Sequence, residues 1–294
     1  MKDLTVGQGK GQEGRFLGLP DPYGSRQRAK IALLPVPYDK TTSYQHGADL
    51  GPEALIEASR NIELYDIETH SEVYQQGIYT AEPVVVETSE RMLAEVYRRT
   101  LELIDEDKFV VTLGGEHSIS YAPIRAHADR FGPISVLQFD AHADLHPAYE
   151  RNPWSHASVM ARVKELPKVL KIVSVGIRSM SAEELPLLDR DNTFFAHQID
   201  GGDWMKQVLG KLSEKVYITF DLDVFDASLM PSTGTPEPGG LFWKQATELL
   251  SLVMQNRQVV GCDVVELLPN PHNVAPDYTA AKLVYKMLSY RFRR

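Results

Sequence analysis

Three residues of one short segment have the types and the spacing of metal ligands. Asp140, His142 and Asp144 occupy alternate positions, and the small residues Ala141 and Ala143 lie between them. In an extended segment, side chains at alternate positions point to the same side. The spacing therefore directs two carboxylates and one imidazole at a common point, which predicts a site for a divalent cation.

Three further residues extend this ligand set. Asp221 and Asp223 repeat the alternating spacing, and His117 follows two glycines that allow the backbone to turn sharply. Four aspartates held close together without a cation would raise one another's pKa and become protonated acids. Two ions suit four carboxylates and two imidazoles, with two aspartates bridging. Oxygen-rich ligands without thiolate favour Mn²⁺, and Cys262 alone cannot build a closed zinc site.

The elements around these residues predict how they come together. Apolar runs of strand length alternate with helical patterns, which indicates one mostly parallel sheet with helices on both faces. The predicted strands are 30–35, 109–113, 134–139, 170–175, 193–196, 216–220 and 259–265. The predicted helices are 52–59, 90–104, 119–130, 157–166, 182–188, 242–254 and 276–290. Residues 1–29 are expected to be a loose N-terminal extension of a single α/β domain, residues 30–294.

Each polar cluster comes directly after a predicted strand. The first residues of the four clusters are His117, Asp140, Asp221 and Glu266. In an open parallel sheet, ligands bind outside the carboxyl ends of the strands. The sequence therefore predicts that these four clusters meet at one edge of the sheet. His127 lies in a polar helical pattern and is expected to face solvent.

The composition limits the class of protein. Among 294 residues, 43% are hydrophobic and 24% are charged, as in ordinary globular proteins. The single cysteine excludes an intrachain disulfide and favours a reducing compartment. The N-terminus has no apolar signal-peptide core, and no apolar run is long enough for a membrane span. The net charge of −9 argues against nucleic acid as a partner. A cytoplasmic protein is expected.

The motifs that carry these residues resemble those of the ureohydrolases, the superfamily of arginases and agmatinases. The matching stretches are 35–38, 47–52, 114–118, 140–144, 155–157, 221–226, 234–240 and 263–266. The resemblance runs from about residue 28 to the C-terminus and is strongest to bacterial and archaeal agmatinases. It implies a three-layer α/β/α catalytic domain with a mainly parallel, eight-stranded sheet. It also implies homotrimers or homohexamers.

The resemblance further implies two Mn²⁺ ions per subunit, bridged by a hydroxide. The ligands of the first ion would be His117, Asp140, Asp144 and Asp221. The ligands of the second ion would be Asp140, His142, Asp221 and Asp223. Asp140 and Asp221 would then bridge the two ions.

Hydrolysis of a guanidinium group needs a nucleophile, a holder for the planar cation and a proton for the leaving amine. Glu266 suits the second role, because a carboxylate can accept two parallel N–H bonds from a guanidinium. His156 suits proton transfer and corresponds to the family histidine that follows the first metal loop. Asp144 is predicted to be a catalytic residue together with Glu266 and His156. Glu237 and Tyr149 are further candidates for substrate contacts.

The segment 145–152 is expected to face the tail of the substrate. It lacks the Ser- and Asn-bearing loop of arginases, which disfavours arginine as the substrate. The sequence of residues 234–240 is more similar to agmatinases than to arginases. Agmatine, hydrolysed to putrescine and urea, is the preferred substrate among small cationic guanidino compounds. N1-aminopropylagmatine, guanidinobutyrate and arginine stay open. The sequence does not decide whether His146 and Arg151 contact the tail.

Two other classes of protein compete with this interpretation. A deacetylase-like hydrolase with a single zinc ion would not need both aspartate motifs complete. A non-catalytic regulator descended from an enzyme would be expected to lose ligands. All six predicted ligands are present in this sequence, which disfavours both classes.

Overall fold

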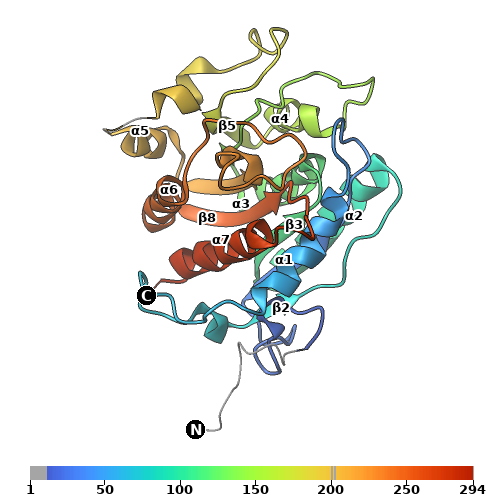
Figure 1. The fold of residues 1–294 in the computed structure, drawn as a ribbon, viewed down its shortest axis with the longest axis vertical. Coiled ribbons are helices and arrows are strands. Elements are labelled where there is room, and N and C mark those ends of the chain that lie inside the picture. Colours follow the sequence, from blue (N-terminus) through green and yellow to red (C-terminus); the bar gives the residue numbers. More distant parts are fainter. Residues whose placement is uncertain (1–11, 200, 202, 294) are drawn as a thin grey trace.

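The computed structural model describes residues 12–199, 201 and 203–293. Within them, eight strands form one sheet in the order β2-β1-β3-β8-β7-β4-β5-β6, and every neighbouring pair is parallel (Figure 1). The strands are β1 (Ile31–Val36), β2 (Ile78–Thr80), β3 (Phe109–Gly114), β4 (Ile134–Phe139), β5 (Val169–Ile177), β6 (Thr193–Phe195), β7 (Lys215–Asp221) and β8 (Gln258–Val265). The predicted fold class is confirmed.

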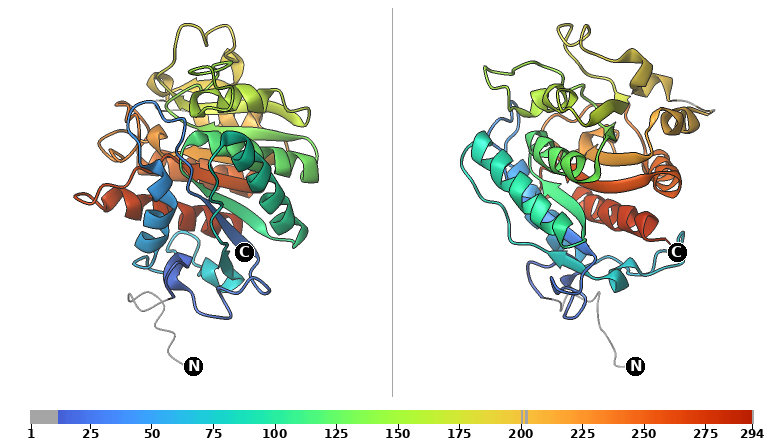
Figure 2. Two further views of the ribbon diagram at one scale, coloured as in Figure 1. Left: turned by 90° about the vertical axis from the view of Figure 1, so that its right-hand side faces the viewer. Right: turned by 180° about the vertical axis from the view of Figure 1, so that it is seen from behind.

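Helices cover both faces of this sheet. The α-helices are α1 (Gly51–Ser59), α2 (Ser89–Asp105), α3 (Tyr121–Phe131), α4 (Val159–Lys164), α5 (Trp204–Lys211), α6 (Trp243–Asn256) and α7 (Ala275–Arg291). Helix α7 packs against α1 and α6 on one face, whereas α2, α3 and α4 lie on the other (Figures 1 and 2). Among the described residues, no helix combines the length and the apolar character needed to cross a bilayer.

The two helical layers explain why most residues of the central strands are apolar. Along β1, Ile31 and Leu33 pack with the layer of α1 and α7, whereas Ala32 and Leu34 pack with α2. Successive side chains of a strand point to opposite faces, so a sheet covered on both sides buries every position. Polar side chains are then accommodated where strands end, which is where the predicted ligands lie.

Three segments differ from the predicted elements. All seven predicted strands are present, but the short strand β2 and the helix α5 were not predicted. Residues 182–188 were predicted as a helix and instead form turns. The reason is Glu184, whose carboxylate accepts the backbone N–H of Leu145 (2.9 Å) and of Ser181 (2.7 Å) and so fixes a turn beside the sheet edge. Pro186 adds a second obstacle to a helix here.

The described part of the N-terminal extension, residues 12–29, is packed rather than loose. Phe16 and Leu19 are fully buried in the same core as α7. The backbone N–H of Leu17 donates to the Ser59 hydroxyl at 2.7 Å. Residues 1–11 lie outside the described residues, and the division at residue 30 stays a prediction.

The prediction that His127 faces solvent is wrong. Its side chain is 0% exposed, and its Nδ1 donates to the Pro123 carbonyl at 2.7 Å. The ring lies between Phe131 and Tyr217, because α3 is buried on the side that faces the sheet. On that side, a Cβ added at Gly261 would meet His127 Nε2 at 2.1 Å. Strand β8 therefore needs a glycine at this position.

We predict that Gly261→Ala destabilises the fold by about 1–3 kcal/mol, because the added methyl group overpacks this contact. Urea unfolding measures the change in the free energy of unfolding. Gly210→Ala is the matched control, since a Cβ there meets nothing within 4 Å. In a His127→Ala background the cost of Gly261→Ala should shrink. An unchanged cost would show that the contact with His127 is not its cause.

Candidate metal centre and active site

The candidate site lies at the carboxyl ends of four strands that are neighbours in the sheet, β3, β8, β7 and β4. His117 follows β3, Glu266 follows β8, Asp221 ends β7 and Asp140 follows β4. These strands are far apart in the sequence, but their adjacency brings the four clusters to one edge. The predicted convergence is therefore present in the structure.

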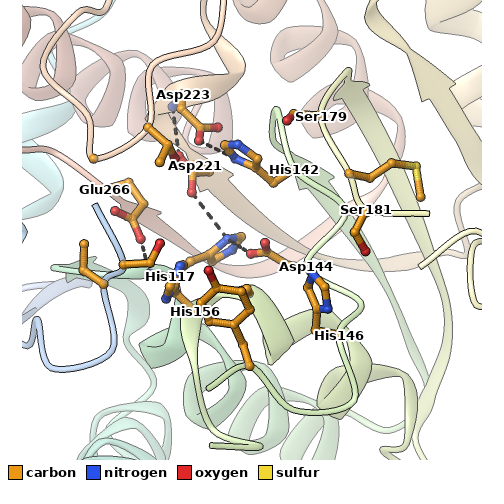
Figure 3. Close-up of a pocket in the computed structure, with 18 of the residues that line it drawn as sticks. His117, His142, Asp144, His146, His156, Ser179, Ser181, Asp221, Asp223 and Glu266 are labelled. Carbon is orange, nitrogen blue, oxygen red and sulfur yellow. Dashed lines mark hydrogen bonds and ion pairs between the residues drawn. The ribbon is translucent and has the colours of Figure 1, made fainter. Parts of the chain in front are cut away.

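The first group of candidate ligands surrounds His117. Its Nδ1 lies 3.0 Å from Asp144 Oδ2, 3.1 Å from Asp140 Oδ2 and 3.4 Å from Asp221 Oδ2. Figure 3 shows His117 between Asp144 and Asp221. These four side chains come from the ends of three strands and are buried. The set equals the ligand set that the resemblance implied for the first ion.

A hydrogen-bonded chain behind His117 fixes the tautomer of its ring. Thr219 Oγ1 donates to Asp263 Oδ1 at 2.7 Å, and Tyr217 donates to the other oxygen of Asp263 at 2.9 Å. Because the Thr219 hydrogen is used in this way, Thr219 Oγ1 accepts from His117 Nε2, 2.9 Å away. Nδ1 then carries a lone pair, which points at three carboxylates and has no hydrogen-bond partner.

The second group lies beside the first and shares Asp140 with it. His142 Nδ1 is 2.8 Å from Asp223 Oδ2 and 3.8 Å from Asp140 Oδ1. Backbone and amide donors hold the shared carboxylate: His142 N–H donates to Oδ1 at 2.6 Å, and Gln138 Nε2 donates to Oδ2 at 2.9 Å. Both groups have ligand atoms close enough together to hold one cation each.

The electrostatics of these groups fit bound cations. Burial and the charge of Asp140 raise the pKa of Asp144 to about 7. Burial and the charges of Asp223 and Asp140 raise the pKa of Asp221 well above its ordinary value. A buried imidazole lone pair that faces carboxylates is unfavourable. A divalent cation would remove this repulsion, because both the lone pair and the carboxylates could bind to it. The residues present therefore fit two metal ions.

A cavity of about 200 Å³ opens in front of the two groups. Its lining includes five acidic side chains: Asp144, Glu184, Asp221, Asp223 and Glu266. None of the described residues that line it is Lys or Arg. This charge pattern suits a cationic ligand and opposes an anionic one.

Glu266 is held in place against the first group. Its Oε1 accepts the backbone N–H of His117 at 2.7 Å, and its own N–H donates to the Gly115 carbonyl at 2.8 Å. Its backbone φ of 66° lies in the left-handed region, which is uncommon for a residue with a side chain. Asp144 has the same feature with φ of 53°. Such conformations concentrate at functional sites, where the surroundings enforce them.

His156 lines the cavity in an aromatic cluster. The Tyr149 ring packs edge-on against it with 5.7 Å between centroids, and His146 lies 5.5 Å from Tyr149. Burial lowers the pKa of His156 to about 4. His156 is therefore a neutral imidazole at neutral pH.

The sequence model of the arginase family matches residues 29–289. The chain belongs to the arginase family. It is 40% identical over 278 residues to an N(1)-aminopropylagmatine ureohydrolase of Thermus thermophilus, covering 92% of both chains. It is 32% identical over 270 residues to an agmatinase of Pyrococcus horikoshii, covering 90% of this chain and 93% of the relative.

A solved structure supports the same assignment. The proclavaminate amidino hydrolase of Streptomyces clavuligerus superimposes with a TM-score of 0.85 at 25% identity, covering 95% of this chain and 97% of that one. The predicted resemblance is confirmed, and this member of the arginase family is a ureohydrolase, an enzyme that hydrolyses amidines.

Glu237, predicted to contact the substrate, and Arg151, which the sequence left undecided, are not among the residues that line the cavity. Glu237 is half-buried outside the cavity lining, where its carbonyl accepts from Arg178 Nη2 at 2.8 Å. Arg151 is exposed and also absent from the lining. Arg178 Nη2 also donates to the carbonyl of Asp223 at 2.7 Å and so ties the backbone of Glu237 to that of Asp223. The contact of Glu237 with the substrate stays a prediction. Tyr149 and His146 do line the cavity.

Several lining residues carried no signal in the sequence. The loop after β1 contributes Thr42 and Ser43, and the loop after β5 contributes Ser179, Ser181 and Glu184. These residue types are common in loops and have no metal-ligand spacing. Only the positions of β1 and β5 beside the four central strands bring them to the cavity.

We predict that Asp140→Asn weakens Mn²⁺ binding by at least about 10-fold, because it removes a charge that both groups share. Metal content after dialysis and calorimetric titration measure the effect. Asp107→Asn, in an exposed turn, is the control of equal charge change. Two ions bound with wild-type affinity by Asp140→Asn would remove this residue from the ligand set.

Proposed function

We propose that this ureohydrolase uses two Mn²⁺ ions to split a long cationic guanidine, N1-aminopropylagmatine, and accepts agmatine less well. The observation that carries the proposal is a second buried acid in the cavity, apart from the metal groups and Glu266. Glu184 lines the same cavity and contacts Leu145, Ser181 and His146. The sequence alone favoured agmatine. The greater identity to the Thermus enzyme than to the Pyrococcus agmatinase supports the longer substrate.

The reaction adds a water oxygen to the guanidinium carbon and breaks one C–N bond. The products are urea and an amine, and the amine nitrogen must gain a proton as the bond breaks. Bound in pairs, divalent ions lower the pKa of water so that a strong nucleophile is available at neutral pH. The residues of this chain must then hold the cation, orient it and move the proton.

Glu266 and Asp144 are proposed to position the guanidinium group. One oxygen of Glu266 is anchored by the His117 backbone, so its carboxylate has a fixed orientation at the cavity. A fixed carboxylate fits a planar guanidinium through parallel N–H bonds. Asp144, held in its left-handed conformation beside His117, completes the acidic wall around the reacting carbon.

His156 is proposed to transfer the proton. It is neutral at neutral pH and lines the same cavity, so it is able to accept a proton and deliver it to the leaving amine. The edge-on packing of Tyr149 holds the plane of the imidazole ring. Tyr149 itself is proposed to contact the substrate chain.

Glu184 is proposed to bind the aminopropyl tail. The residue is only 3% exposed, and its carboxylate is oriented by the N–H groups of Leu145 and Ser181. His146 Nε2 lies 3.4 Å from its Oε2. The tail of N1-aminopropylagmatine carries a secondary and a primary ammonium group, and Glu184 is proposed to accept a hydrogen bond from one of them. Agmatine has a shorter tail with a single ammonium group and so depends less on Glu184. The trimer or hexamer implied by the resemblance belongs to this proposal.

We predict that urea release by the Mn²⁺-loaded enzyme has the highest kcat/KM with N1-aminopropylagmatine, followed by agmatine. Arginine, guanidinobutyrate and guanidinopropionate should react poorly, because each carries a carboxylate into a cavity lined by acids. Enzyme treated with a chelator is the control. A preference for a carboxylate-bearing guanidine would contradict the proposed substrate, and no urea from any of them would contradict the proposed function.

We predict that Glu184→Gln raises KM for N1-aminopropylagmatine about 10-fold, the loss of about 1.4 kcal/mol of binding. The variant keeps the shape of the side chain but loses a charge-assisted hydrogen bond. KM for agmatine should change less, and kcat should be preserved for both. Glu183→Gln, at the exposed neighbouring position, is the matched control. Equal effects on KM for both substrates would show that Glu184 does not bind the aminopropyl tail.

A further inference from the structure

Thr41 lies between a buried carboxylate and the proposed proton-transfer histidine. We propose that Thr41, anchored by Glu116, is a positioning residue that holds His156 in the tautomer with hydrogen on Nδ1 and leaves Nε2 free to take a proton. The inference rests on the proposed role of His156. It concerns a residue outside the metal groups.

Glu116 acts only as an acceptor in this arrangement. Its side chain is 0% exposed and receives four donors from one loop and one turn. Oε2 accepts the backbone N–H of Lys40 at 2.8 Å and of Thr41 at 2.6 Å. Oε1 accepts the Thr41 hydroxyl at 2.6 Å and also the Ser118 hydroxyl. Four donors match the lone pairs of one carboxylate.

This arrangement fixes the direction of the Thr41 hydroxyl. A hydroxyl has a single hydrogen, and the hydrogen of Thr41 is given to Glu116. Thr41 Oγ1 is therefore an acceptor towards His156. It receives the backbone N–H of His156 at 3.0 Å and lies 3.3 Å from its Nδ1. The favourable tautomer has the hydrogen on Nδ1.

The tautomer decides what His156 can do. With hydrogen on Nδ1, the neutral ring has its lone pair on Nε2, and it accepts a proton there. With hydrogen on Nε2, the lone pair would lie on Nδ1 and face the oxygen of Thr41, and Nε2 could not accept a proton. When Nε2 is protonated, the chain from Nδ1 through Thr41 to Glu116 stabilises the imidazolium charge. Thr41 does not need to touch the substrate for this effect.

A purely structural role for Thr41 makes different predictions. Glu116 binds the backbone of Lys40 and Thr41 and so holds the loop that brings Thr42 and Ser43 to the cavity. If the hydroxyl served only this loop, its loss would disturb substrate binding or metal content. If it orients His156, its loss should act on the chemical step.

The test compares Thr41→Val, which keeps the shape and loses the hydroxyl, with Thr41→Ser, which keeps the hydroxyl. With the full Mn²⁺-loaded enzyme, Thr41→Val should lower kcat about 10- to 100-fold with little change in KM or metal content. Thr41→Ser should restore most of kcat. The limb of the pH–rate profile that disappears in His156→Asn should move to lower pH in Thr41→Val, because the imidazolium loses its support.

A double-mutant cycle completes the test. Thr41→Val should cost little further activity in a His156→Asn background, since it would act through that ring. Additive losses, reduced metal content or equal damage in Thr41→Ser would overturn the inference. A wild-type enzyme that releases no urea from the guanidine panel would instead refute the proposed function, so the two failures are distinguishable.

Discussion

The repulsion among buried carboxylates at the carboxyl edge of four adjacent strands is the constraint on which the rest of this structure depends. Asp140, Asp144, Asp221 and Asp223 are buried together, and burial raises the pKa of two of them, Asp144 to about 7. Without cations, some of these acids would be neutral and the orphaned lone pair of His117 would face oxygen atoms. Two divalent ions, as proposed, would offset the repulsion among these carboxylates. Backbone donors then need only hold each carboxylate in position.

The same arrangement positions two of the three histidines proposed to act at the site, His117 and His156. Asp263 accepts from Thr219, which accepts from His117, and Glu116 accepts from Thr41, which accepts from His156. In each series of hydrogen bonds, a buried carboxylate accepts the hydrogen of a threonine hydroxyl, and the hydroxyl oxygen then favours one tautomer of the histidine ring. The first series of hydrogen bonds leaves a lone pair on Nδ1 of His117, the proposed metal ligand. The second leaves a lone pair on Nε2 of His156, the proposed proton acceptor.

The sequence was informative where chemistry is local and uninformative where it depends on packing. The spacing of Asp140, His142 and Asp144 and the position of each cluster after a strand were enough to predict the ligand groups and the parallel sheet. The turn at 182–188 was missed because Glu184 is bonded to Leu145, a contact that helical periodicity does not encode. His127 was misjudged because its polar neighbours face solvent while the ring itself faces Gly261. Glu237 was placed near the substrate by its motif, but it is not among the residues that line the cavity.

The strand order also sets when the site forms during synthesis. In the sheet, β8 lies between β3 and β7, although it is the last strand in the chain. His117 and Asp221 therefore cannot lie side by side until residues 258–265 have been inserted between their strands. A nascent chain that has made every metal ligand still lacks the central strand that assembles them. A cation that needs both His117 and Asp221 would therefore bind tightly only after β8 has been made and has taken its place in the sheet.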